Sequence, residues 1–143
     1  TFIKPKQSSR ESAVRIKLNV LKEAVAGRRI IMIDDSIVRG TTSALIVNML
    51  RDAGAREVHV RISAPPFLHP CYFGTDIPSE DQLIAHGHTV EEIRDMIGAD
   101  SLSYLKMDRL QEMACSRSIC TACFSGKYPI EPPVEDIRGS YDK

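Results

Sequence analysis

The stretch from Arg28 to Thr42 reads R-R-I-I-M-I-D-D-S-I-V-R-G-T-T, and the rest of the chain can be understood outward from it. Residues 30–33 are four consecutive large apolar side chains, three of them β-branched, which is typical of a strand buried on both faces of a parallel sheet. Two acids follow, and then a short loop with one glycine. Residues 42–53 have the apolar spacing of a helix, and Gly54 is placed to end it. This order of strand, acidic pair, loop and helix predicts an α/β fold.

A ligand is expected where this strand ends, because open α/β folds bind ligands at the carboxyl ends of their strands. The backbone N–H groups of Gly40, Thr41 and Thr42 come at the start of a helix, where unpaired donors and the helix dipole attract phosphate. Asp34 and Asp35 only accept hydrogen bonds when ionised, so they suit sugar hydroxyls or a hydrated divalent cation. A phosphorylated sugar satisfies both demands.

Taken alone, an Asp-Asp pair at a strand end is more often a turn and helix cap than a binding site. The chain has neither the G-x-x-x-x-G-K-[ST] motif of nucleoside triphosphate sites nor the G-x-G-x-x-G motif of dinucleotide sites. Its apolar strand, acidic pair and following loop instead resemble the phosphoribosyl pyrophosphate (PRPP) signature of type I phosphoribosyltransferases. The exact sequence I-D-D-S-I-V-R-G-T-T-S is more specific and resembles that of the glutamine PRPP amidotransferase family.

The resemblance implies a partial type I phosphoribosyltransferase domain with a Rossmann-like parallel sheet in residues 1–70. Residues 71–130 would form a helical, cysteine-bearing appendage, and residues 131–143 an irregular tail. Asp34 and Asp35 would hold the ribose hydroxyls and magnesium. The phosphate would be held by a loop of seven consecutive residues: Ser36, Ile37, Val38, Arg39, Gly40, Thr41 and Thr42.

Composition is that of an ordinary globular protein, with 143 residues, 43% of them hydrophobic and 27% charged. Lys plus Arg and Asp plus Glu both number 19, so a broad nucleic-acid or membrane surface is not expected. No apolar run approaches the length of a membrane span and no signal peptide is evident, which favours a cytoplasmic protein. The four cysteines are then expected to be thiols or metal ligands.

The first eleven residues are poor in periodicity and carry Lys4, Lys6 and Arg10. Such a start is commonly a solvated terminal segment. In the resembled family, however, T-F-I-x-P-x-Q-x-x-R belongs to a mobile lid over the substrate. Residues 1–11 would then be this lid, and its three cations would offset the charge of the departing pyrophosphate.

The remaining pattern predicts a second strand over residues 57–64, nearer a sheet edge than the first because its alternate residues are polar. Capping-box spacing predicts short helices after Ser79 and after Thr89, the second ending near Gly98. A further helix is expected over residues 107–114, with Leu110 and Met113 turned inward.

Cys120 and Cys123 form a C-x-x-C pair, which redox, zinc and iron–sulfur sites all use. A redox pair is expected where a helix follows a strand, whereas this pair lies in a glycine- and proline-bounded tail, so metal ligation is favoured. One branch of the resembled family holds a [4Fe-4S] cluster through H-P-C-[YF]-[FY]-G-x-D and C-x-x-C-F-x-G-x-Y-P segments. Both segments occur here, so the resemblance implies Cys71, Cys120 and Cys123 as ligands. The fourth family ligand would precede Thr1; either Cys115 substitutes for it, the centre is lost, or the four thiolates capture zinc.

The resemblance implies transfer of ammonia, released from glutamine by an amino-terminal glutaminase domain, to PRPP, giving 5-phosphoribosylamine and pyrophosphate in the first step of purine synthesis. The chain resembles a carboxyl-terminal fragment that would be inactive alone. Purine nucleotides as feedback ligands and a homo-oligomer are also implied. Two alternatives remain open: a non-catalytic regulatory module that binds PRPP or nucleotides, and a fragment whose main property is metal binding.

Overall fold

The computed structural model describes residues 18–74, 79–115 and 118–132. Three parallel strands form one sheet in the order β1-β2-β3, with β1 at Arg29–Asp34, β2 at Glu57–Ile62 and β3 at Ser101–Tyr104. In the register of the sheet, Ile31 lies beside His59, and His59 lies beside Ser101. The predicted α/β class with a parallel sheet is therefore confirmed.

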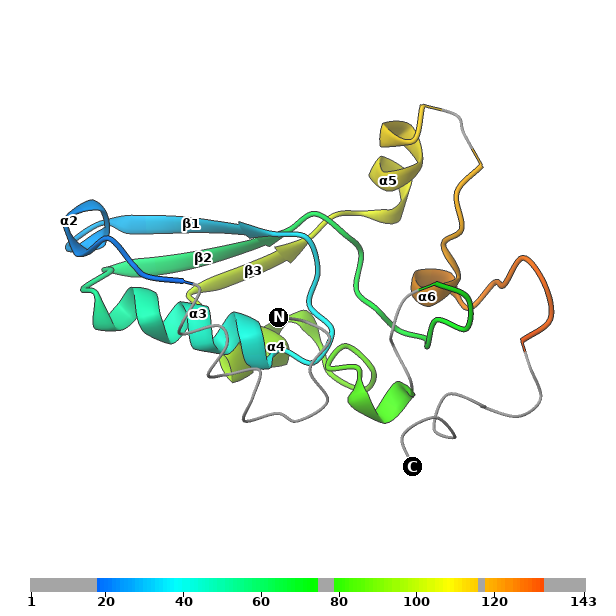
Figure 1. Ribbon diagram of the computed structural model, residues 1–143, viewed down its shortest axis with the longest axis horizontal. Coiled ribbons are helices and arrows are strands. Elements are labelled where there is room, and N and C mark those ends of the chain that lie inside the picture. The colour runs from blue at the N-terminus through cyan, green and yellow to red at the C-terminus, as the bar shows by residue number, and fades with distance from the viewer. Residues whose placement is uncertain (1–17, 75–78, 116–117, 133–143) are drawn as a thin grey trace.

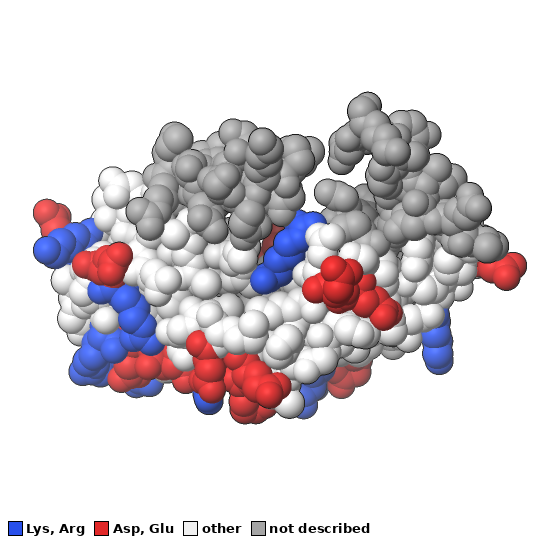
Figure 2. Space-filling view, turned by 90° about the horizontal axis from the view of Figure 1, so that it is seen from below, with Lys and Arg blue, Asp and Glu red and all other residues white. Residues whose placement is uncertain are grey.

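Helices α3 (Thr41–Asp52) and α4 (Val90–Ile97) lie together on one side of the sheet (Figure 1). The other helices are short: α2 (Lys22–Val25), the 3-10 turn η1 (Glu80–Gln82), α5 (Met107–Met113) and α6 (Ala122–Ser125). None of the helices in the described ranges has the length and apolar character needed to cross a membrane. On the helix side of the molecule, basic and acidic side chains are interspersed (Figure 2).

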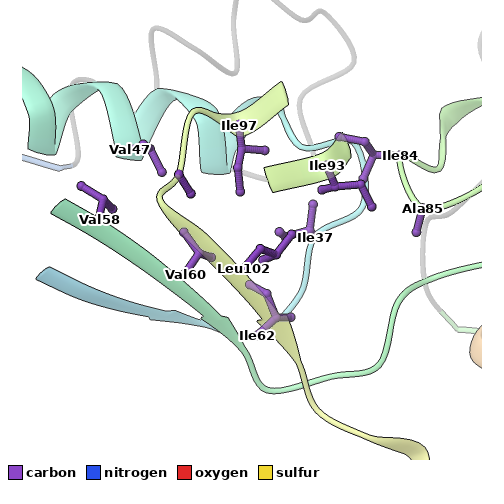
Figure 3. Close-up of a cluster of buried hydrophobic side chains, with 11 residues drawn as sticks. Ile37, Val47, Val58, Val60, Ile62, Ile84, Ala85, Ile93, Ile97 and Leu102 are labelled. Atoms are coloured by element: carbon purple, nitrogen blue, oxygen red, sulfur yellow. The ribbon is translucent and has the colours of Figure 1, made fainter. Parts of the chain in front are cut away.

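The main hydrophobic core fills the space between the sheet and this helix pair. Val58, Val60 and Ile62 alternate along β2 and point toward α3 and α4 (Figure 3). Val47 of α3 and Ile97 of α4 meet them from the helices. The central strand thus buries one complete face by the period-two rule of β structure.

The first strand differs from expectation, because β1 is exposed on one face and lies at an edge of the described sheet. Ile31 is 65% exposed and Ile33 74% exposed, so the prediction that both faces are buried is wrong for the described chain. The second strand, predicted nearer an edge, is the central one. The physical reason is that α3 and α4 cover only one face, and among the described residues no helix packs on the other.

β3 was not predicted, and it lies in the range assigned to the appendage. Four residues, S-L-S-Y, are too few for a periodic signal, so its identity depends on pairing with β2. Leu102 joins the main core beside the β2 valines. The sheet therefore continues past residue 70, across the boundary expected from sequence.

The predicted helix starts have different outcomes. Thr89 begins α4 with a complete capping box to Glu92, and Gly98 ends it in the left-handed conformation, as expected. After Ser79 only a 3-10 turn forms, without a side-chain cap. The helix predicted over 107–114 is present as α5, but Met113 is 67% exposed, so its predicted inward orientation is wrong.

Asp100 links the helix layer to the sheet. Its carboxylate accepts hydrogen bonds from the Val58 N–H at 2.6 Å and from the Arg51 guanidinium of α3 at 2.9 Å. These bonds hold the pKa of Asp100 below its ordinary value, and the bond from the Val58 N–H has the larger effect. A carboxyl group with a lowered pKa stabilises the fold above its unfolded pKa, and this stabilisation is lost as the pH falls through the lowered value.

Replacing Asp100 by alanine should lower the free energy of unfolding by about 1–2 kcal/mol at neutral pH, because the Val58 N–H loses its partner. Urea unfolding followed by circular dichroism measures this change. Asp95→Ala, which removes an exposed carboxylate that pairs with neighbouring Arg94, is the matched control and should cost less than about 0.5 kcal/mol. Equal losses in the two variants would show that Asp100 does not link the layers.

Candidate functional site

The acidic pair lies where β1 ends, at the carboxyl edge of the sheet. Asp34 is half-buried and is the last residue of the strand, and its Oδ1 accepts the Asp35 N–H at 2.9 Å. The Asp34 carbonyl accepts the N–H and hydroxyl of Ser63, just beyond β2, at 2.9 and 3.1 Å. Asp35 is exposed, and Ser36 donates to its carboxylate at 3.0 Å. The two carboxylates are thus adjacent, and only the first is partly withdrawn from water.

Burial raises the pKa of Asp34 above its ordinary value, and the neighbouring charge of Asp35 adds to this effect. The hydrogen bond from the Asp35 N–H opposes the shift without cancelling it. Ionisation of Asp34 therefore costs free energy in the ligand-free protein. A cation or a hydrogen-bond donor bound at the pair would recover that cost.

The loop after the acids is anchored by its apolar side chains. Ile37 is 2% exposed and points into the main core among β2, β3 and α4 (Figure 3). Val38 packs in a second cluster, formed by buried Phe67 and Leu83 with Val38, Cys71, Cys123 and Phe124. Both residues were predicted to contact substrate. With their side chains in these clusters, their backbone groups are what they can offer a ligand.

Gly40 precedes α3 in the left-handed conformation, with φ +78°. A Cβ added there would collide with Ile84 Cδ1, so space as well as backbone conformation favours glycine. The Gly40 carbonyl accepts the Ala44 N–H at 2.9 Å, which closes the first turn of the helix. Exposed Thr41 and half-buried Thr42 follow, with N–H groups at the helix start as expected for a phosphate site.

Residues 82–84, more than forty positions later in the chain, contact this loop. Gln82 Oε1 accepts hydrogen bonds from the Arg39 guanidinium, the Nε bond measuring 3.0 Å. The Ile84 N–H donates to the Val38 carbonyl at 2.8 Å. Sequence reasoning identified Arg39 but missed Gln82 and Ile84, because no local pattern marks a contact between such distant segments.

Two of the four cysteines pack against the second cluster. Cys71 and Cys123 are half-buried and pack there, while Cys120 and Cys115 are exposed. Burial, followed by the nearby thiol of Cys71, raises the pKa of Cys123, with a smaller effect from Cys120. In the described part of the chain, no three His, Cys, Asp or Glu side chains form a group that could hold a metal ion. The predicted ligands are therefore near one another without forming a complete site.

The predicted lid, with Lys4, Lys6 and Arg10, lies outside the described residues, as does part of the predicted tail. The acidic pair and residues 36–42 follow one another from the carboxyl end of β1 to the start of α3, with Ile37 and Gly40 buried among them. The groups of this segment can accept hydrogen bonds at one end and donate them at the other. That combination suits an anionic, hydroxyl-bearing ligand.

The search of family models gave no match. Among curated proteins, the chain is 54% identical over 142 residues to the amidophosphoribosyltransferase of Archaeoglobus fulgidus, covering 96% of this chain and 31% of the relative. It is 57% identical over 141 residues to that of Synechococcus elongatus, covering 96% of this chain and 28% of the relative. It is 52% identical over 139 residues to that of Bacillus subtilis, covering 92% of this chain and 29% of the relative. The chain thus spans less than a third of the length of these relatives.

Two solved structures share the fold with a TM-score of 0.76. One is glutamine PRPP amidotransferase from B. subtilis complexed with ADP and GMP, 49% identical, with 94% of this chain and 31% of that chain covered. The other is described as the allosteric regulatory enzyme of purine biosynthesis, 50% identical, with 95% and 30% covered. Sequence and fold agree with the signature around Asp34 and Gly40, and over nearly all of its length the chain is similar to one part of the amidophosphoribosyltransferases.

Proposed function

We propose that this chain provides the PRPP site of an amidophosphoribosyltransferase, which transfers ammonia derived from glutamine to PRPP in the first step of purine synthesis. The observation that carries the proposal is the placement of Asp34 and Asp35 at the end of β1, directly before a loop that reaches left-handed Gly40 and the start of α3. The similarity of nearly the whole chain to amidophosphoribosyltransferases, at about half identical residues, supports it. Because the chain spans under a third of these relatives, we expect residues 1–143 alone to be inactive.

The chemistry requires these residues to hold the sugar of the substrate at both ends. The bond from the sugar C1 to pyrophosphate breaks with positive charge at C1, and ammonia forms the new C–N bond at that carbon. The N–H groups and hydroxyls of residues 40–42 hold the 5-phosphate, while Asp34 and Asp35 accept hydrogen bonds from the ribose hydroxyls. Fixing both ends of the sugar positions C1 for attack, and no covalent bond to the protein is required.

Magnesium, when bound, neutralises the departing pyrophosphate. Asp34 and Asp35 fit this ion in donor chemistry, because carboxylate oxygens are the ligands that magnesium prefers. The raised pKa of Asp34 supports the assignment, since a partly desolvated carboxylate gains most from an adjacent cation. We further propose that Lys4, Lys6 and Arg10 belong to a lid that closes over this end of the substrate, and that the protein is cytoplasmic.

We also propose that Cys71, Cys120 and Cys123 are ligands of a [4Fe-4S] cluster. Packing of Cys71 and Cys123 in one apolar cluster and the proximity of Cys120 support the proposal. The three sulfurs do not form a metal site as they lie in the described chain, so the proposal includes a rearrangement on binding and a fourth ligand.

A second candidate function is binding of purine nucleotides as regulators at the same loop. The B. subtilis structure is complexed with ADP and GMP, and both ligands carry a 5-phosphate on a ribose. A loop that recognises the phosphate and hydroxyls of PRPP would accept such nucleotides. We propose that this chain binds them in a homo-oligomer.

Thr42→Val in the complete protein should weaken binding of PRPP and GMP alike, by roughly 1–3 kcal/mol for a lost donor to a charged phosphate. Isothermal calorimetry measures both affinities. Asn48→Ala, an exposed substitution farther along α3, serves as the control and should leave them unchanged. Unaltered affinity of Thr42→Val for both ligands would remove the loop from the site.

Asp34→Asn should stabilise the ligand-free protein at pH 7, by up to about 1 kcal/mol, while impairing magnesium-dependent turnover. Because the pKa of Asp34 is raised in the folded protein, its ionisation destabilises the fold at pH values above the ordinary pKa of 3.8. Below pH 3.8, Asp34 is protonated in both the folded and the unfolded protein, so the stability gained by Asp34→Asn should vanish. Urea unfolding across pH, with exposed Asp52→Asn as control, measures the gain. A variant that is less stable at pH 7, or fully active at limiting magnesium, would contradict the assignment.

Anaerobically purified complete protein should contain iron and acid-labile sulfide, and Cys123→Ser should lose both. The half-buried thiol of Cys123 interacts with both Cys71 and Cys120, so its removal should affect the site most. Metal analysis and visible absorption provide the measurement, and Cys115→Ser is the matched control that should retain both. Folded wild-type protein without iron or sulfide would refute the cluster while leaving the transferase proposal intact.

A further inference from the structure

The segment 82–84 contacts the phosphate loop through three different kinds of interaction in three consecutive residues. Gln82 accepts two hydrogen bonds from the Arg39 guanidinium through its side-chain oxygen. Leu83 and Phe67 form the buried cluster against which Val38 packs. Ile84 donates its N–H to the Val38 carbonyl at 2.8 Å. The loop is therefore held at Val38 and Arg39 by one short segment from outside the motif.

The position of this segment is itself fixed from both sides. Glu80, at the start of η1, lies 3.2 Å from His69 Nδ1 and 3.5 Å from His86 Nε2 through its two carboxylate oxygens. The side chain of Ile84 belongs to the main core and lies against Gly40. Gln82 thus lies between two anchored residues, Glu80 and Ile84. It can therefore hold the Arg39 side chain in a fixed position.

We propose that Gln82 is a positioning residue for PRPP, acting through Arg39 on the backbone of residues 38–40; this inference rests on the proposed function. Two hydrogen bonds from one planar guanidinium fix its orientation as well as its distance. Fixing Arg39 in turn fixes the peptide groups on either side of it, next to the phosphate-binding helix start. A loop held in this way before the ligand arrives loses little conformational entropy on binding.

This role predicts a specific kinetic signature. A preorganised loop holds the 5-phosphate equally in the ground state and the transition state, because the phosphate is remote from the bond that breaks. Loss of the restraint should therefore raise KM for PRPP and leave kcat nearly unchanged. A residue that only supported the fold would instead lower the amount or melting temperature of the protein without changing KM.

The test compares Gln82→Met and Gln82→Glu in the complete protein. Methionine keeps the length of the side chain and removes the oxygen acceptor, so KM for PRPP and the Kd of ribose 5-phosphate should each rise roughly tenfold, with kcat within about threefold of wild type. Glutamate keeps an oxygen acceptor for Arg39 and should leave both constants within about threefold. If Gln82→Met fails to fold, Gln82→Leu carries the same test.

A double-mutant cycle identifies the route of the effect. Arg39→Met should raise the Kd of ribose 5-phosphate by itself, and adding Gln82→Met to it should have no further effect, because the two residues act as one unit. Unchanged or tighter binding in Gln82→Met, or additive effects in the double variant, would overturn the inference. Wild-type protein that neither binds ribose 5-phosphate nor uses PRPP would instead overturn the proposed function, so the two failures are distinguishable.

Discussion

Burial of the Ile37 side chain is the constraint on which the candidate site depends. It lies two residues after Asp35 and three before Gly40, and it enters the main core beside β2, β3 and α4. Full burial of an isoleucine stabilises a fold by about 1.5–3 kcal/mol, so the loop cannot slide along the sheet without a comparable loss. The acids and the helix start are therefore held at a fixed separation on either side of Ile37.

Val38, the next residue, packs in a different cluster, with Phe67 and Leu83. Consecutive side chains directed into two clusters leave the intervening backbone little freedom, and the bond from the Ile84 N–H restricts it further. A polar loop held by apolar anchors in this way is rigid although its surface is hydrophilic. Its flexibility cannot be judged from composition alone.

The sequence was sufficient for the parts of this arrangement that are local. The strand, the acidic pair, Gly40 and α3 follow one another within twenty-five residues, and each has its own residue signal. Partners from residues 82–84 could not be predicted, because their contacts with the loop arise only when α4 and the sheet pack together. β3 was missed for the same reason: four residues carry no periodicity, and their strand character depends on pairing with β2.

The exposure of β1 was mispredicted because an apolar side chain favours burial but becomes buried only where another helix or strand covers it. On the open face of the sheet, Ile31 and Ile33 are exposed, while the polar residues of β2 beside them are better covered. There Glu57 bonds to Arg29 at 2.6 Å and contacts His59 at 3.0 Å, and Ser101 lies 2.9 Å from the other His59 nitrogen. Polar alternation in β2 therefore reflects a hydrogen-bonded network on a central strand and not the solvent face of an edge.

The desolvation of Asp34 follows from this same architecture. A carboxylate at the end of a strand, beside a second carboxylate and above a packed core, is costly to ionise, and a sequence selected only for stability would favour a neutral residue there. The cost becomes useful when a ligand supplies hydroxyl donors or a cation, because the free energy recovered on binding then adds to affinity. The raised pKa of Asp34 is thus a cost to the ligand-free fold that such a ligand would offset.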